Sequence, residues 1–274
     1  MLVKGKPGNS ISIRDRGLLY GDGVFRTLLA TLGEAQHWPL HYQKLQHDCA
    51  ALGIVCPDAA LLSAELDDLL ELHPDGVIKL IVTRGEGARG YAPPACAKPT
   101  HLWDVGLLPE YPADWTRHGI KARLCQLRLG QQPLLAGVKH LNRLENVLAA
   151  AEWNDADIAE GILLDDLGNV TGGTRSNLFM VRGGTLVTPE LSRCGVAGVQ
   201  RGRVMEWATT HNVPCRVEPF GLAELLAADE IFLVNSVIGL WPIRELQDRN
   251  WSQHPLALQI QKDLNPENSI GVLS

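Results

Sequence analysis

Residues 136–145 read AGVKHLNRLE, and Lys139 in this stretch separates two kinds of sequence. The residues just before it, 134–138, are apolar or glycine. After it, apolar residues recur at three- and four-residue spacing, as they do along one face of a helix, at Leu141, Leu144, Val147 and Leu148. The pattern predicts that Lys139 lies where a buried segment turns into a helix.

A lysine in such a place has two interpretations. In water its ammonium group is protonated and is no nucleophile, whereas a desolvated lysine loses its charge readily and can form a Schiff base. Alternatively, the lysine is structural, with a buried stem and an ammonium group that reaches solvent or an acid. Position alone favours the structural interpretation, so the choice depends on the rest of the chain.

Composition indicates a soluble globular protein. The chain has 274 residues, enough for two modest domains or one large one. Its 45% hydrophobic and 20% charged residues disfavour disorder. The net charge of -6 argues against a nucleic-acid or anionic-membrane partner. Residues 1–5 lack an apolar signal core, and the most apolar stretch, 231–243, is too short to span a bilayer. We therefore expect a cytoplasmic protein.

Several common site types have no support in the sequence. The six cysteines are scattered without a CxxC pair, which is typical of reduced thiols and not of a disulfide framework or zinc site. The nine histidines include no HExxH motif and no cluster at metal-ligand spacing. We find no Walker loop, no GxGxxG and no GxSxG, which disfavours the usual nucleotide-binding and hydrolase interpretations.

The first half of the chain alternates strand-like and helix-like patterns. Buried strands are predicted near residues 24–29, 77–82 and 101–107. Helices are predicted over about 40–52 and 58–72, the second with Asp58 as its N-cap.

The second half predicts further strands, near residues 162–164, 178–181, 185–187 and 231–234, and a helix that begins after Gly198. Strands interleaved with helices indicate an α+β enzyme of two domains. A site between domains is a common place for a cofactor.

Further stretches resemble one enzyme family, in the same order along the chain. They are DRG at 15–17, YGDGVF at 20–25, RG at 84–85, RGY at 89–91, VTGGTRSNLF at 170–179, GVAGV at 195–199, and NS at 235–236 with GLWP at 239–242. Together with GVKHLNRLE at 137–145, they are similar to the fold-type IV pyridoxal-phosphate enzymes, the class-IV aminotransferase family, and within it to the aminodeoxychorismate lyases. Each motif alone is weak, but the ordered set is specific.

The resemblance implies a fold and an assembly. The family fold is α+β, with a small N-terminal α/β domain and a larger, β-rich and barrel-like C-terminal domain. On this chain the small domain is expected over residues 1–110, an interdomain connection over 111–133, and the large domain, which would carry Lys139, over 134–274. The resemblance also implies a homodimer that acts on a small-molecule substrate.

The implied activity is a pyridoxal 5'-phosphate-dependent lyase reaction of folate biosynthesis. It converts 4-amino-4-deoxychorismate into 4-aminobenzoate and pyruvate. Two alternatives stay open. One is a D-amino-acid or branched-chain-type transaminase of the same fold. The other is a catalytically silent member that binds a ligand or partner without turnover.

The family motifs assign cofactor-binding roles to particular residues. Lys139 would hold the cofactor covalently and act in catalysis. A phosphate dianion favours backbone N–H groups at a helix start, which Val199 and Gln200 would supply after Gly198. Ser236 would add a hydroxyl group.

Two residues depart from the family pattern. Lys44 stands where the family has an arginine that binds the phosphate, so the charge is kept but the bidentate fork is lost. Gly172 stands where the family has a glutamate that pairs with the pyridine nitrogen. We expect Gly172→Glu to restore that carboxylate, provided that the backbone does not need a positive φ, which glycine alone adopts cheaply.

The family loop provides candidates for substrate binding. Arg89 and Tyr91 would grip substrate carboxylates, a task that suits the planar guanidinium group; exposed loop residues without a role are the alternative. His140, Asn142 and Arg143 lie beside the lysine and are candidates to bind the cofactor's phenolate oxygen. For Arg143, a solvated position in the first helical turn is the simpler interpretation.

Overall fold

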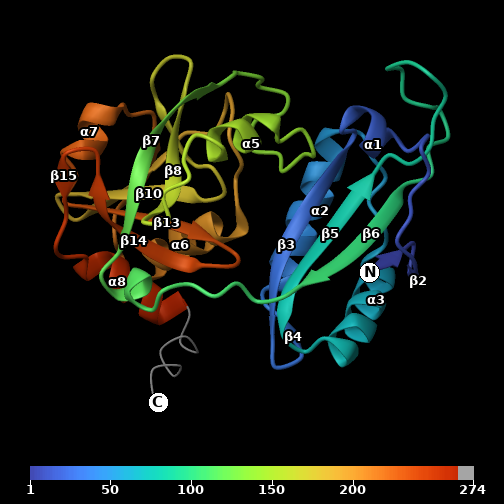
Figure 1. The fold of residues 1–274 in the computed structure, drawn as a ribbon, viewed down its shortest axis with the longest axis horizontal. Helices are drawn as coiled ribbons and strands as arrows, with labels where there is room; N and C mark the ends of the chain where they lie inside the picture. The colour runs from blue at the N-terminus through green and yellow to red at the C-terminus, as the bar shows by residue number, and fades with distance from the viewer. Residues whose placement is uncertain (265–274) are drawn as a thin grey trace. The chain divides into compact units, whose positions relative to one another are not determined.

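The computed structural model describes residues 1–264 and divides into two compact units. The first unit contains Met1–Glu110 together with Val138–Arg143, and the second contains Tyr111–Gly137 and the chain from Leu144 onward. Each unit has its own sheet, its own helices and its own hydrophobic core (Figure 1). Within residues 1–264, every helix is too short or too polar to cross a lipid bilayer.

The first unit is built on a six-stranded antiparallel sheet in the order β2-β1-β6-β5-β3-β4. Its strands are β1 (Leu2–Val3), β2 (Lys6–Pro7), β3 (Gly23–Thr31), β4 (Glu34–Ala35), β5 (Gly76–Thr83) and β6 (Thr100–Gly106). Its helices are α1 (Arg16–Tyr20), α2 (Trp38–Ala51) and α3 (Ala59–Leu72).

Helices α2 and α3 cover one face of this sheet (Figure 1). Leu45 of α2 and Leu62 of α3 are fully buried against Leu28 of β3. The α3 helix begins where the sequence predicts, because the Asp58 carboxylate accepts hydrogen bonds from the backbone N–H groups of Ala60 and Leu61, at 2.9 and 3.4 Å.

The segment that carries Lys139 is attached to strand β3. The Lys139 carbonyl accepts a hydrogen bond from the Phe25 N–H at 3.0 Å, and the Leu141 N–H donates to the Gly23 carbonyl at 2.9 Å. Val138 belongs to the same hydrophobic core as β3. The sequence predicts Lys139 within the C-terminal domain, whereas in the structure these bonds place its segment with the first unit.

The second unit is built on a nine-stranded mixed sheet that curls into a half-barrel. Its order is β12-β11-β10-β13-β14-β7-β8-β9, with β15 paired to β14. The strands are β7 (Ile120–Leu129), β8 (Ile158–Asp165), β9 (Val170–Gly173), β10 (Asn177–Arg182), β11 (Thr185–Pro189), β12 (Cys215–Glu218), β13 (Glu230–Asn235), β14 (Gly239–Leu246) and β15 (Arg249–Asn250).

Up to residue 264, the second unit contains five helices: α4 (Asp114–Arg117), α5 (Leu144–Ala150), α6 (Val199–Thr210), α7 (Leu222–Leu226) and α8 (Pro255–Leu264). Val204 and Trp207 of α6 pack with Ile260 of α8 against Phe179 and Phe232 on one face of the sheet (Figure 1). A second cluster, which includes Ile162, Leu178 and Trp241, fills the inside of the curl. The α+β architecture predicted from the sequence is confirmed.

Strand β7 occupies the stretch expected to be an interdomain connection, 111–133. It pairs in parallel with β14 on one side and β8 on the other, so it lies inside the sheet. Residues Ile120 and Ala122 are buried, but Lys121 and Arg123 alternate with them and conceal the apolar pattern. The boundaries 1–110, 111–133 and 134–274 stay predictions for independently folding domains.

Candidate active site

Lys139 lies among charged residues of the first unit. Its side chain is partly buried, and its ammonium nitrogen, Nζ, lies 4.9 Å from the centre of the Phe25 ring. Burial, followed by the positive charges of Arg26, Arg143 and Lys79, lowers the pKa of Lys139 from 10.5 to about 7, while Asp48 opposes that shift. A sizeable fraction of the amine is therefore neutral near pH 7, as a nucleophile or base requires.

Asp48 is the centre of the charge network around this lysine. The carboxylate is fully buried and pairs with Arg26 and Lys44, and its Oδ2 atom accepts a hydrogen bond from the Lys139 backbone N–H at 3.1 Å. Although burial alone raises its pKa, the charges of Arg26 and Lys44 hold the pKa of Asp48 below its usual value. One buried anion thus fixes both the lysine backbone and two cations.

Arg26 is a site residue that the sequence did not single out. It lies on β3 among residues that alternate between buried and part-exposed, and it falls on the buried face with Val24 and Leu28. Only 2% of Arg26 is exposed, and its Nε atom has no hydrogen-bond partner among the described residues. The available signal was a charged residue inside an apolar strand, which is costly unless it is paired.

Lys44 is bound to Asp48 one helical turn away on α2. Burial lowers the pKa of Lys44, and the attraction of Asp48 partly offsets this effect. Its ammonium group therefore already has a protein anion beside it. The role of Lys44 as a phosphate ligand stays a prediction.

The residues after the lysine are held by local bonds. The Arg143 Nε atom donates to the His140 carbonyl at 3.0 Å, and the Asn142 amide donates to the Gly21 carbonyl at 3.1 Å. Burial, with a further contribution from Arg143, lowers the pKa of His140 to about 4, so its imidazole is neutral at neutral pH. Its Nδ1 atom is buried without a partner among residues 1–264.

Arg16, which is only 3% exposed, holds the loop that contains Arg89 and Tyr91. The Arg16 guanidinium donates to the carbonyls of Gly90 and Tyr91 at 3.0 and 2.8 Å. The Tyr91 side chain is 85% exposed, with its ring centroid 5.4 Å from that of Tyr20, and Arg89 is exposed too. Their predicted roles in substrate binding stay predictions.

In the second unit, Asn177 organises the start of helix α6. Its Oδ1 atom accepts a hydrogen bond from the Gly198 N–H at 3.0 Å, and its Nδ2 atom donates to the Val196 carbonyl at 2.7 Å. A Cβ atom on Gly198 would lie 2.4 Å from Asn177 Oδ1, so a larger residue here would displace the Asn177 side chain. Among the described residues, no side chain caps the helix, which leaves the first amides, those of Val199 and Gln200, suited to an anion.

Ser236 lies in the turn between β13 and β14. The Asn235 side chain shapes that turn, because its Oδ1 atom accepts hydrogen bonds from the N–H groups of Val237 and Ile238, at 2.8 and 2.9 Å. Its Nδ2 atom donates to the Arg175 carbonyl at 3.2 Å. The turn is thus tied to the segment that leads into Asn177.

Gly172 has a backbone that disfavours any other residue. Its φ is +151°, and a Cβ atom would lie 2.8 Å from the Ser176 carbonyl oxygen. The condition attached to Gly172→Glu is therefore not met. Glu160, 1% exposed on the neighbouring strand, lies with its side chain against Gly173 and accepts hydrogen bonds from Thr174 and Ser176.

The structure thus gathers the predicted residues into two groups. In the first unit, Lys139 and Lys44 meet at Asp48. In the second, the 172–177 segment connects Gly172 to the start of α6 and to the turn that contains Ser236. The sequence assigned no role to Asp48, Arg26 and Glu160, because none of them belongs to a quoted motif. Asn177 lies inside the motif at 170–179, but the motif alone did not assign it a role.

Comparison with known proteins identifies the family. The class IV amino-transferase family model matches residues 23–246. This chain therefore belongs to the class-IV aminotransferase family, and the two-unit α+β architecture is that of its members.

Within the family, two lyases are markedly similar to this chain. The crystal structure of 4-amino-4-deoxychorismate lyase from Pseudomonas aeruginosa shares 47% identity and a TM-score of 0.94, and the match covers 97% of this chain and 98% of that one. Aminodeoxychorismate lyase from Vibrio harveyi is 36% identical over 88% of this chain and 89% of its own length. A transaminase relative, D-alanine aminotransferase from Bacillus licheniformis, is 26% identical over 95% of this chain and 92% of its own.

Proposed function

We propose that this protein is a pyridoxal-phosphate-dependent lyase that converts 4-amino-4-deoxychorismate into 4-aminobenzoate and pyruvate. The observation that carries the proposal is a lysine with a pKa of about 7 at the position of the family's cofactor lysine. The 47% and 36% identities to two lyases support the choice of reaction. Two aminotransferase relatives share less, at 34% for a putative branched-chain-amino-acid aminotransferase and 26% for the D-alanine aminotransferase.

Each unit holds residues that suit one part of the cofactor. The neutral amine of Lys139 is suited to attack an aldehyde, and the uncapped start of α6 is suited to a phosphate. Val199 and Gln200 would supply amide N–H groups, Ser236 a hydroxyl group and Lys44 a positive charge. When bound, pyridoxal phosphate supplies an electron sink next to the substrate's nitrogen.

Lys139 would also move the proton that starts the reaction. The neutral amine of Lys139 would take the proton from C4 of the substrate ring. The electron pair left at C4 forms the new ring double bond as the C3–O bond breaks. The oxygen leaves as enolpyruvate, which becomes pyruvate, and the ring becomes aromatic.

Aromatisation provides a physical reason why Gly172 is tolerated. The family glutamate keeps the pyridine nitrogen protonated and so strengthens the electron sink. A transaminase depends on that sink throughout. In the lyase reaction the forming aromatic ring supplies driving force of its own, so a weaker sink costs less. Gly172 therefore favours the lyase over the transaminase, and we propose that position 172 lies at the pyridine nitrogen.

The test is a direct assay of both reactions on the purified, cofactor-loaded protein. We expect 4-aminobenzoate and pyruvate in equal amounts from 4-amino-4-deoxychorismate, and little amino transfer from D-alanine or leucine to 2-oxoglutarate. Faster amino transfer than 4-aminobenzoate formation would establish a transaminase instead. Absence of both activities, with the cofactor bound, would indicate a silent family member.

A second measurement locates the cofactor without relying on turnover. Borohydride reduction followed by peptide mapping should find the pyridoxyl group on Lys139, and Lys139→Ala should lose both the label and the activity. Lys79→Ala is the matched control, because Lys79 lies 5.2 Å from the same Phe25 ring. A label on Lys79 or Lys44 would overturn the assignment.

Wider features of the proposal follow from the family resemblance. We propose a homodimer that acts in folate biosynthesis, with Arg89 and Tyr91 as ligands of substrate carboxylates. A cytoplasmic location stays a prediction from the sequence.

A further inference from the structure

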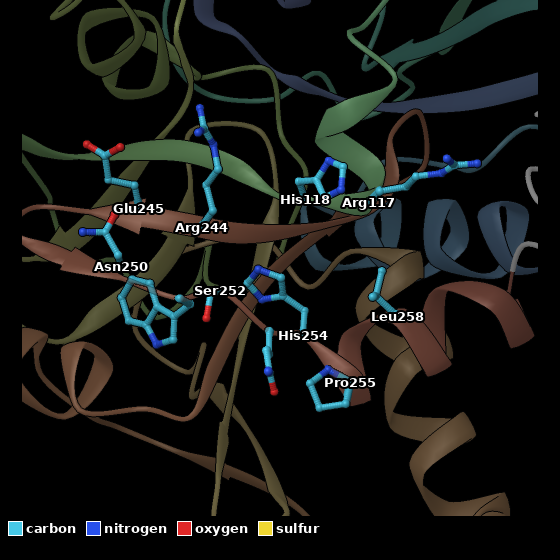
Figure 2. A pocket seen from close by; sticks show the side chains of 11 residues that line it. Arg117, His118, Arg244, Glu245, Asn250, Ser252, His254, Pro255 and Leu258 are labelled. Atoms are coloured by element: carbon cyan, nitrogen blue, oxygen red, sulfur yellow. The ribbon is translucent and has the colours of Figure 1, made fainter.

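A cavity of about 740 Å³ opens in the second unit, between helix α4, strands β14 and β15, and the start of helix α8. Figure 2 shows the side chains that line it, with Arg117 and His118 on one side, Arg244 and Glu245 on the strand, and His254 between them. Its volume lies in the range typical of small-molecule sites. None of the residues assigned to the reaction lines this cavity.

Positive charge exceeds negative charge among the residues that line the cavity. Arg117 and Arg244 both line it, and within residues 1–264 neither guanidinium group has a hydrogen bond or ion pair with the protein. Glu245, the acidic residue of the lining, is bound to Lys121 at 2.8 Å. The cavity therefore has two available guanidinium groups, while its carboxylate is neutralised.

His254 lines the same cavity and can report on its occupancy. It is 4% exposed and lines the cavity, and neither of its ring nitrogens has a hydrogen-bond partner in the described chain. Burial lowers its pKa, so the ring is neutral near pH 7 and offers one N–H donor and one acceptor. Both nitrogens are closed to solvent and therefore to a molecule in the open cavity, so His254 serves as a reporter of a nearby ligand and not as its hydrogen-bond partner.

The start of helix α8 does not account for the unpaired histidine. The first amides of the helix, those of Leu256 and Ala257, donate to the Glu230 carboxylate, each at 3.0 Å. Trp251, 5% exposed, donates its indole N–H to the Ala228 carbonyl at 2.8 Å and presents the rest of its ring to the lining. Leu258 and Pro255 add apolar surface.

We propose that this cavity binds a small organic anion, with a carboxylate or phosphate head between Arg117 and Arg244 and an apolar body against Trp251 and Leu258, next to His254. Guanidinium groups suit both kinds of head group, because each accepts two parallel N–H bonds. The inference is independent of the proposed reaction.

The test follows His254 directly, because the active site also takes up anions. The full-length, cofactor-loaded protein is labelled with ring-¹⁵N histidine, and the His254 signals are assigned by their loss in His254→Gln. Benzoate and phenyl phosphate are the probes for the two head groups, and benzamide is the uncharged control. We expect saturable shifts of the His254 signals with at least one of the two anions and none with benzamide.

Substitutions then assign the binding to the arginines. Arg117→Gln and Arg244→Gln should each weaken binding roughly fivefold, the effect of losing one part-exposed charge contact. Arg249→Gln is the matched control, because Arg249 lies on the adjacent β15 strand and outside the lining. Because Arg117 and Arg244 are exposed, neither substitution should change the circular dichroism spectrum.

Each outcome decides the question. Shifts with one anion alone support the site and assign its head group, and shifts with both support it with a mixed preference. Unshifted His254 signals at saturating probe, equal shifts with benzamide, or equal weakening by Arg249→Gln would each overturn the proposal.

Discussion

At the scale of single residues, the charge of Lys139 depends on the balance between Arg26 and Asp48. Arg26 lowers the pKa of the lysine and Asp48 raises it. The two residues also pair with each other inside the first unit. Removing the charge of Arg26 and removing that of Asp48 should therefore move the pKa of Lys139 in opposite directions.

We predict that Arg26→Gln raises the pKa of Lys139 above about 7 and that Asp48→Asn lowers it. The measurement is the pH midpoint of amine labelling at Lys139 in the cofactor-free protein. Because the neutral amine reacts, labelling rises with pH through the pKa. Shifts of the same sign in both variants would contradict this electrostatic account.

The substitution Asp48→Asn should also lower the stability of the protein. Asp48→Asn leaves Arg26 buried without its anion, which costs on the order of 3–5 kcal/mol in the free energy of unfolding. Urea unfolding of the two variants measures this cost. A loss within experimental error for Asp48→Asn would show that water enters and solvates Arg26.

Gly172→Glu tests the departure from the family pattern. We predict that the variant is destabilised by about 1–3 kcal/mol, because a residue with a side chain is strained at this backbone conformation. Gly106→Glu is the control: it adds the same side chain to strand β6, where a Cβ atom meets only the Val77 carbonyl, at 3.9 Å. Equal unfolding free energies would mean that β9 rearranges to accept the family glutamate.

The sequence identified Lys139 but missed its surroundings. The lysine is marked by a motif, whereas Asp48 comes next to it only because α2 packs on the sheet that also holds the lysine segment. Sequence spacing reveals neighbours along a helix, such as Lys44 and Asp48, but not neighbours 91 residues apart, such as Asp48 and Lys139. The tertiary fold is needed to find them.

At the scale of elements, the start of α6 depends on close contact between Gly198 and Asn177. We predict that Gly198→Ala weakens binding of pyridoxal phosphate, because a Cβ atom would displace Asn177 and the backbone that it holds. Equilibrium titration with the cofactor measures the effect.

Gly202→Ala is the matched control on the same helix. A Cβ atom at Gly202 meets nothing within 4 Å, so alanine should stabilise the helix by roughly 0.5–1 kcal/mol without changing cofactor affinity. Equal affinities in the two variants would remove the start of α6 from the phosphate site.

The elements were predicted unevenly. The structure confirms helices α2, α3 and α6 and strands β3, β5, β10 and β13 close to their predicted bounds. The strands are rich in β-branched and apolar residues, and α3 has its apolar residues on one face. Strand β7 was missed because its exposed positions carry lysine, arginine and glutamine, and prolines precede and follow it. Pairing with β8 and β14 stabilises β7 regardless of its own pattern.

At the scale of the whole molecule, helix α5 has an apolar surface that the described chain leaves exposed. Leu144, Val147 and Leu148 are 69, 60 and 54% exposed, although the sequence placed them on one regular helical face. Exposed apolar groups of this kind mark interaction surfaces. They are consistent with the homodimer implied by the family.

We predict that Leu148→Glu shifts the protein from dimer towards monomer, because a buried carboxylate without a partner opposes association. Sedimentation at several concentrations measures the shift. Leu61→Glu, at a 47% exposed position on α3, is the control for an added charge elsewhere. A wild-type monomer at micromolar concentration would contradict the homodimer itself.

The assignment of Val138–Arg143 to the first unit has a consequence for synthesis on the ribosome. The polypeptide leaves the first unit at Glu110, returns for these few residues and leaves again. When residue 110 leaves the ribosome, the residues of α2 and β3 have been synthesised, but Val138 is still missing from their core. Asp48 likewise still lacks its hydrogen bond from the backbone amide of Lys139. The nascent N-terminal unit therefore cannot complete its native contacts until 33 further residues, Tyr111–Arg143, have followed. Its final folding step and the assembly of the reactive lysine are one event.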